Sequence, residues 1–139
     1  MERLRTRVLV VTDSATPSSA LLRAVAARAA AEDVQFRLVV LNPARAELHL
    51  LHPERHDKAF EAERILLETL PQLECEAGRR IIGSVSVRHD PVEAIEEVVL
   101  SEPVDELLLA LEAADARRRG HRHLLGRLGR FGIPVTSLE

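Results

Sequence analysis

Residues 80–111 read RIIGSVSVRHDPVEAIEEVVLSEPVDELLLAL and predict a complete strand–helix–strand unit. Apolar residues dominate Arg80–Val87, interrupted by Gly83, and again Asp105–Leu111, as in strands buried on both faces. Between them, Asp90–Glu93 combines a capping aspartate with a proline and a glutamate in the first turn of a helix. Two parallel strands need a crossover, which is usually a helix, so this unit favours a parallel sheet.

The same alternation continues on both sides of this unit. Strands are predicted at residues 7–11, 36–41 and 133–138, and helices at residues 17–32, 57–70 and 122–131. Thr16 and Pro17 indicate the start of the first of these helices, and Pro71 indicates the end of the second. Five strands alternating with four helices predict an α/β fold, with a parallel sheet covered on both faces. A chain of 139 residues is expected to form one domain, residues 1–139.

Composition limits the classes of function. The 19 basic and 22 acidic residues give a net charge of −3, which argues against general attraction to nucleic acid or anionic membranes. The charge is uneven, since residues 116–139 hold six Arg and one acidic residue. The single cysteine, Cys75, excludes an internal disulfide. No apolar run has the length of a signal peptide or a membrane span, so a soluble, cytoplasmic protein is expected.

Ligands of parallel α/β sheets bind beyond the carboxyl ends of the strands, near the point where the strand order reverses. The segments that follow the predicted strands are therefore the candidate positions, namely Thr12–Ser14, Leu41–Pro43, His89–Asp90 and the loop after Leu111. The longest irregular candidate is residues 44–56, which would be either a lid or a simple loop.

Four segments together resemble a universal stress protein domain: VLVVTDSA, VRHDPVEAIEEVV, DELLLAL and IPVTSL. Asp90, Pro91, Ala94, Ile95 and Asp105 match the family pattern, while a histidine replaces the glycine before Asp90. The resemblance implies a doubly wound sheet of five parallel strands, of the adenine-nucleotide alpha-hydrolase-like type, and a role in the stress response. It also implies a homodimer paired through the terminal strand, residues 134–138, where an edge strand offers unpaired donors and acceptors.

One subgroup of that family binds ATP through the motif G-x2-G-x9-G-[ST] after the fourth strand. Glycines in such a motif let backbone N–H groups approach phosphate oxygens closely. In this chain Ala110 and Ala113 stand where the first two glycines belong, and His121–Arg122 lie near the last Gly-[ST]. The sequence therefore predicts that the backbone cradle for a triphosphate is lost.

Several residues are nevertheless candidates for binding an adenine nucleotide. By the resemblance, Asp13 would bind the sugar, and backbone groups of Val40 or Leu41 would bind the base. A planar guanidinium fork binds phosphate well, so the basic loop could replace the glycines through Arg118, Arg119, Gly120 and Arg122. Alternatives stay open: Asp13 would begin an Asx turn, and the basic loop would be solvated or would dock a partner protein.

The sequence contains no nucleophile elbow, P-loop or zinc-protease motif, so no enzymatic activity is expected. The histidines at 49, 52 and 56 have helical spacing, but Pro53 interrupts it and no metal site is expected. The predicted function is a non-enzymatic regulatory or binding module without a resident cofactor and without a membrane or specific nucleic acid as partner. The alternative is a protein that binds ATP, AMP or phosphate; slow nucleotide hydrolysis would rest on the fold alone.

Three glycines recur at a period of three near the end of the chain, at Gly126, Gly129 and Gly132. This spacing predicts either a close approach of two backbones or a weak helix, since each glycine costs a helix about 1 kcal/mol relative to alanine.

Overall fold

The computed structural model describes residues 6–31, 33–41, 55–86, 91–111 and 125–138. Its elements are, in order, β1 (Thr6–Thr12), α1 (Ser19–Ala31), β2 (Val34–Val40), α2 (Arg55–Ala77), β3 (Ile82–Val85), α3 (Pro91–Ser101), β4 (Glu106–Ala110), η3 (Gly129–Phe131) and β5 (Val135–Ser137). The described strands form one sheet in the order β3-β2-β1-β4-β5, and all neighbours pair in parallel. The predicted α/β class with a five-stranded parallel sheet is confirmed.

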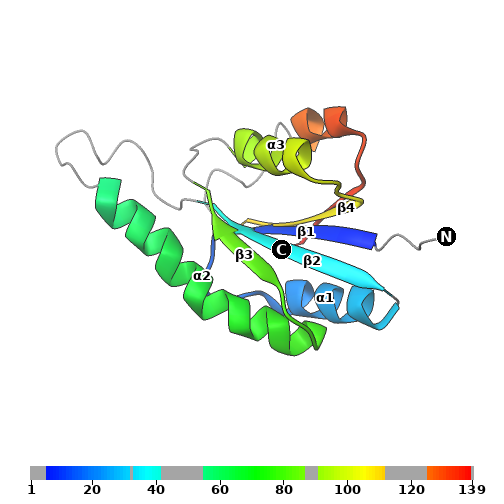
Figure 1. The fold of residues 1–139 in the computed structure, drawn as a ribbon, viewed down its shortest axis with the longest axis horizontal. Helices are drawn as coiled ribbons and strands as arrows, with labels where there is room; N and C mark the ends of the chain where they lie inside the picture. The colour runs from blue at the N-terminus through cyan, green and yellow to red at the C-terminus, as the bar shows by residue number, and fades with distance from the viewer. Residues whose placement is uncertain (1–5, 32, 42–54, 87–90, 112–124, 139) are drawn as a thin grey trace.

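Helices cover the sheet on both sides (Figure 1), with α1 and α2 on one face and α3 with the segment before β5 on the other. The central strand β1 shows why its residues are apolar throughout. Val8 and Val10 pack against α1 and α2, while Leu9 and Val11 pack against α3. A strand with a core on both faces cannot alternate apolar and polar residues.

The start of β4 is fixed by Asp105, a residue that the family pattern also contains. Its carboxylate accepts a hydrogen bond from the backbone N–H of Arg7 at 2.8 Å, and its own N–H donates to the Arg7 carbonyl at 2.8 Å. This pair of bonds joins the second residue of β1 to the residue directly before β4, and so sets the register of the two strands.

The predicted start of α1 is wrong by two residues. Ser18 is the cap, because its hydroxyl accepts a hydrogen bond from the N–H of Leu21 at 3.1 Å. Thr16 lies in a turn instead, since its N–H and carbonyl both bond to the Ser14 hydroxyl. Pro17 therefore precedes the helix rather than opening it.

Pro71 does not end α2, which continues to Ala77. A proline inside a helix removes one hydrogen bond to the carbonyl four residues earlier, here that of Leu67. Both residues lie on the exposed side of the helix, where Leu67 is 72% exposed. A carbonyl on this side can bond to water, so the helix tolerates the loss.

The outer elements are shorter than predicted. β3 spans four residues instead of the eight expected from Arg80–Val87, and β5 spans three instead of the six of Ile133–Leu138. Before β5, residues 125–128 are helical and lead into η3, within the predicted segment 122–131. α3 begins at Pro91 as expected, while its predicted cap, Asp90, lies outside the described residues.

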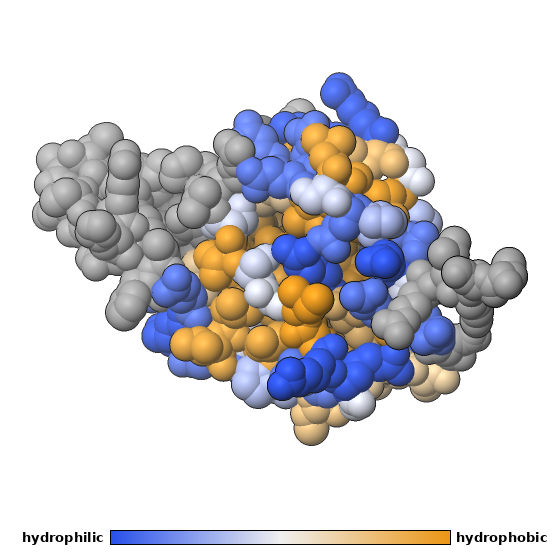
Figure 2. Space-filling model, viewed as in Figure 1, coloured by the Kyte–Doolittle hydropathy of each residue, from blue (hydrophilic) through white to orange (hydrophobic). Residues whose placement is uncertain are grey.

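The side on which α2 and β3 lie carries apolar residues interrupted by charged ones (Figure 2). Among the described residues, the exposed large hydrophobic side chains are Leu67, Ile82 and Leu100.

Candidate functional site

The strand order reverses beside β1. The next strand along the chain, β2, lies on one side of it and β4 on the other. A crevice beyond the carboxyl ends of β1 and β4 is the general ligand position in such sheets. The loop at this position is residues 13–18, between β1 and α1, and we call it the β1–α1 loop.

Two consecutive turns shape the β1–α1 loop. The hydroxyl of Thr12 accepts a hydrogen bond from the N–H of Ser14 at 3.2 Å, and the hydroxyl of Ser14 accepts one from the N–H of Thr16 at 3.2 Å. These are turns of the ST type, in which a side-chain oxygen bonds the backbone two residues later. Asp13 is half-buried and lies between the first pair of bonded residues.

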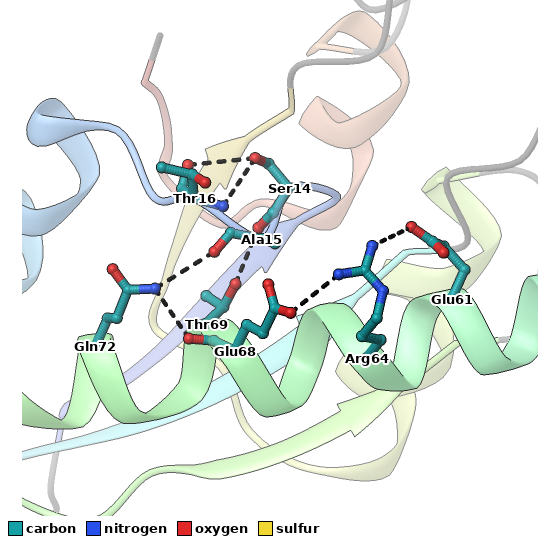
Figure 3. Close-up of polar contacts among 8 residues, drawn as sticks. All are labelled: Ser14, Ala15, Thr16, Glu61, Arg64, Glu68, Thr69 and Gln72. Atoms are coloured by element: carbon teal, nitrogen blue, oxygen red, sulfur yellow. Dashed lines mark hydrogen bonds and ion pairs between the residues drawn. The ribbon is translucent and has the colours of Figure 1, made fainter.

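Helix α2 also holds this loop (Figure 3). The hydroxyl of Thr69 donates to the Ser14 carbonyl at 3.0 Å, and the side-chain amide of Gln72 donates to the Ala15 carbonyl at 3.4 Å. Thr69 is fully buried. Residues 55 and 57 positions apart in the sequence thus meet beyond the carboxyl end of β1.

A small depression lined by described residues lies between β1, β4 and this loop. The depression there has a volume of about 10 Å³, comparable with one water molecule, and it is lined by Thr12, Ser14, Thr16, Pro17, Ser18, Leu21, Ala110 and Leu138. By the resemblance, Ala110 stands at the first glycine position of the ATP motif, and Leu138 directly follows β5. A methyl group and a leucine side chain therefore line this depression.

Backbone groups at the end of β2 take part in the sheet. The Val40 carbonyl accepts a hydrogen bond from the N–H of Ser86 at 2.9 Å, and the Leu41 N–H donates to the Thr12 carbonyl at 2.8 Å. A base placed here would have to use the second lone pair of the Val40 carbonyl or the carbonyl of Leu41.

Arg64 lies on the same helix as Thr69 but is held by two carboxylates (Figure 3). Its guanidinium donates to Glu61 at 2.6 Å and to Glu68 at 3.0 Å. The hydrogen bond and the charge of Glu61 raise the pKa of Arg64, and Glu68 adds to the effect. Arg64 therefore forms exposed ion pairs within its own helix.

The remaining predicted contacts lie outside the described residues: Arg118, Arg119, Gly120 and Arg122 of the basic loop. The side chains of the histidines at 49, 52 and 56 also lie outside them. Within the described part of the chain, no cluster of three or more His, Cys, Asp or Glu could hold a metal ion.

Thr69 and Gln72 belong to no recognisable sequence motif, although the sequence contains a signal for the first. Ile65, Thr69 and Leu73 are spaced by four, and all three are buried along one side of α2. A polar residue in an apolar stripe must find a hydrogen-bond partner. The identity of that partner, Ser14, depends on how α2 packs in space.

Comparisons with known proteins support the fold. No protein-family model and no curated protein sequence matches the chain. Among solved structures, the universal stress protein from Archaeoglobus fulgidus has a TM-score of 0.65 and 16% identity over 98% of this chain and 95% of that one. The complex of the universal stress protein from the same organism with dAMP has the same TM-score and identity and covers 98% of each chain. A universal stress protein in complex with cAMP has a TM-score of 0.59 and 20% identity, covering 96% and 97%.

In the part of the chain that the structure describes, no helix is both long and apolar enough to span a membrane. The strand order, the parallel pairing and the structural likeness over nearly the whole length all agree. The chain has the fold of the universal stress proteins.

Proposed function

We propose that this protein is a non-enzymatic regulatory module that binds an adenine nucleoside monophosphate at the β1–β4 edge rather than ATP in the manner of the family's glycine motif. The observation that supports this most is the β1–α1 loop, which is held in one conformation at the topological switch point with Asp13 in its first turn. Two proteins of the same fold have been solved with dAMP and cAMP, which each carry one phosphate.

Each part of the nucleotide has a proposed partner. The Asp13 carboxylate would accept hydrogen bonds from sugar hydroxyls, and carbonyls at Val40 or Leu41 would accept from the base amino group. The phosphate would bind Arg118, Arg119 and Arg122, with the backbone at Gly120.

The preference for a monophosphate rests on the residue at the end of β4. By the resemblance, Ala110 stands where the ATP motif has its first glycine, so β- and γ-phosphates would find no backbone cradle there. The basic loop would offer charge to one phosphate, but it would not replace the close backbone donors of a glycine-rich loop.

The deciding experiment is calorimetric titration of nucleotide-stripped protein with AMP, with ATP and magnesium, and with inorganic phosphate. We expect saturable binding of AMP, and binding of ATP no tighter than that of AMP. Arg118→Ala/Arg119→Ala should weaken AMP binding. The absence of saturable binding at millimolar AMP would refute the proposal and would favour the basic loop as a docking surface for a protein.

Asp13→Asn should weaken AMP binding about tenfold, because a charged hydrogen bond to the ligand is replaced by a neutral one. Asp33→Asn is the matched control, since Asp33 is exposed and directly precedes β2, at the opposite edge of the sheet. Equal affinity of the Asp13→Asn and Asp33→Asn proteins would exclude Asp13 from the site.

A further inference from the structure

Two side chains of α2, those of Thr69 and Gln72, hold the β1–α1 loop, although they lie 55 and 57 positions away from their partners in the sequence. Each of three consecutive residues has a backbone group bonded to a side chain. Ser14 bonds through its carbonyl to Thr69, Ala15 through its carbonyl to Gln72, and Thr16 through its N–H to the Ser14 hydroxyl. Two of these bonds are donated by side chains of α2, which follows the next strand along the chain.

The contact of Thr69 has the properties of a specific anchor. Thr69 is fully buried, and its hydroxyl lies 3.0 Å from the Ser14 carbonyl oxygen. Removing the donor from this part-buried carbonyl costs free energy, because the partly desolvated acceptor loses its partner. Gln72 makes a weaker contact, since it is exposed, bonds Ala15 at 3.4 Å and also donates to the Glu68 carbonyl at 2.9 Å.

We infer that Thr69, assisted by Gln72, is a positioning residue for the nucleotide site, acting through the β1–α1 loop on Asp13. This inference rests on the proposed binding of an adenine nucleotide by Asp13. The Thr69 hydroxyl sets the Ser14 carbonyl, and Asp13 is joined to Ser14 by one peptide bond. A loop already held in its binding conformation loses little further entropy when the ligand binds, so affinity is gained without any contact to the ligand.

The test compares the AMP affinity of the wild type with that of variants at Thr69, Gln72 and Thr136. Thr69→Val removes the hydroxyl and keeps the shape, and it should weaken AMP binding about tenfold. Thr69→Ser keeps the hydroxyl and should restore most of the affinity. Thr136→Val is the matched control, because Thr136 in β5 bonds Glu106 at 3.4 Å and is absent from the residues that hold the loop. Gln72→Ala should weaken binding less than Thr69→Val does.

Hydrogen exchange of the protein without ligand gives an independent measurement. The amides of Ser14 and Thr16 should exchange about tenfold faster in Thr69→Val than in the wild type or in Thr136→Val. If AMP binds the wild type and Thr69→Val alike, the positioning role is refuted while the proposed function stands.

If the wild type does not bind AMP, the proposed function fails, and the exchange data alone decide whether α2 sets the loop conformation. Unchanged exchange at Ser14 and Thr16 in Thr69→Val would overturn the inference in either case. Faster exchange together with weaker AMP binding, both reversed in Thr69→Ser, would support it.

Discussion

Gly132 ends η3 in the left-handed backbone conformation, with φ of 69°, and its N–H donates to the Gly129 carbonyl at 3.2 Å. A side chain is strained in this conformation, whereas glycine is not. Within residues 125–138 and the other described segments, the close backbone approach that the three-residue glycine spacing suggested is not found. Among the described residues, a Cβ added at Gly126 or Gly129 would meet no atom within 4 Å.

Alanine substitutions at two of these glycines should change the free energy of unfolding in opposite directions. Gly132→Ala should lower the free energy of unfolding by about 1 kcal/mol, because Cβ strain is introduced where no packing is gained. Gly126→Ala should raise it by about 0.5–1 kcal/mol, because residue 126 is in a helical turn with open space around it. Urea unfolding of the two variants measures both values. Destabilisation by Gly126→Ala would show that residue 126 lies against another part of the chain.

At the scale of elements, one ion pair ties α1 to the sheet. The Arg28 guanidinium donates to both carboxylate oxygens of Glu106 in β4, at 3.1 and 2.5 Å, and both side chains are at least two-thirds buried. The hydrogen bond to Glu106 raises the pKa of Arg28. A raised pKa means that the arginine contributes its stability at all pH values below its ordinary pKa and loses it only above, so this contribution stays constant across neutral pH.

Glu106→Gln should therefore lower the free energy of unfolding by about 1–2 kcal/mol, since a two-bond charged contact becomes a neutral one. Glu68→Gln is the control on α2, where the Arg64 and Glu68 side chains are 52% and 50% exposed. Solvent screens such a pair, so no measurable change is expected there. Equal losses in the two variants, measured by urea unfolding at the same ionic strength, would contradict the role of burial.

At the scale of the whole molecule, the sheet has two edges, β3 and β5. β5 bonds β4 through the Pro134 carbonyl and the Leu138 N–H, so the backbone groups of Val135 point away from β4. We propose that a second copy pairs along this side of β5 and completes a homodimer. The pairing would bring together two copies of a strand that, among the described strands, has a neighbour on one side only.

Light scattering at micromolar concentration should show a dimer of the wild type. Val135→Pro should shift it to a monomer, because proline removes an outward N–H that pairing needs. The unfolding transition of the variant should remain cooperative, since the bonds from β5 to β4 are made by residues 134, 136 and 138. A wild-type monomer at these concentrations, or a Val135→Pro dimer, would refute pairing through β5.

The sequence alone determined the class of fold and the order of its elements. Continuous apolar runs such as Leu107–Ala110 require burial on both faces, and short helices between them require parallel crossovers. Local chemistry was less decisive at element ends: Thr16 and Pro71 carry the usual cap and stop signals, yet Ser18 caps α1 and α2 continues past the proline. At Thr16 the competing partner is the Ser14 hydroxyl. At Pro71 the helix surface is exposed, so water can bond the carbonyl that the proline leaves free.

The sequence predicted that Asp13 follows the first strand, at the carboxyl edge of the sheet, but not how its loop is held. Asp13 could be placed at the edge because its position depends only on the end of β1. The anchoring of its loop by Thr69, and the position of Leu138 beside Ala110, required the packed structure. These contacts join residues far apart in the chain, so their existence depends on helix packing and strand order, which no local spacing encodes. The apolar pattern specifies which residues are buried, and only the tertiary arrangement decides which of them meet.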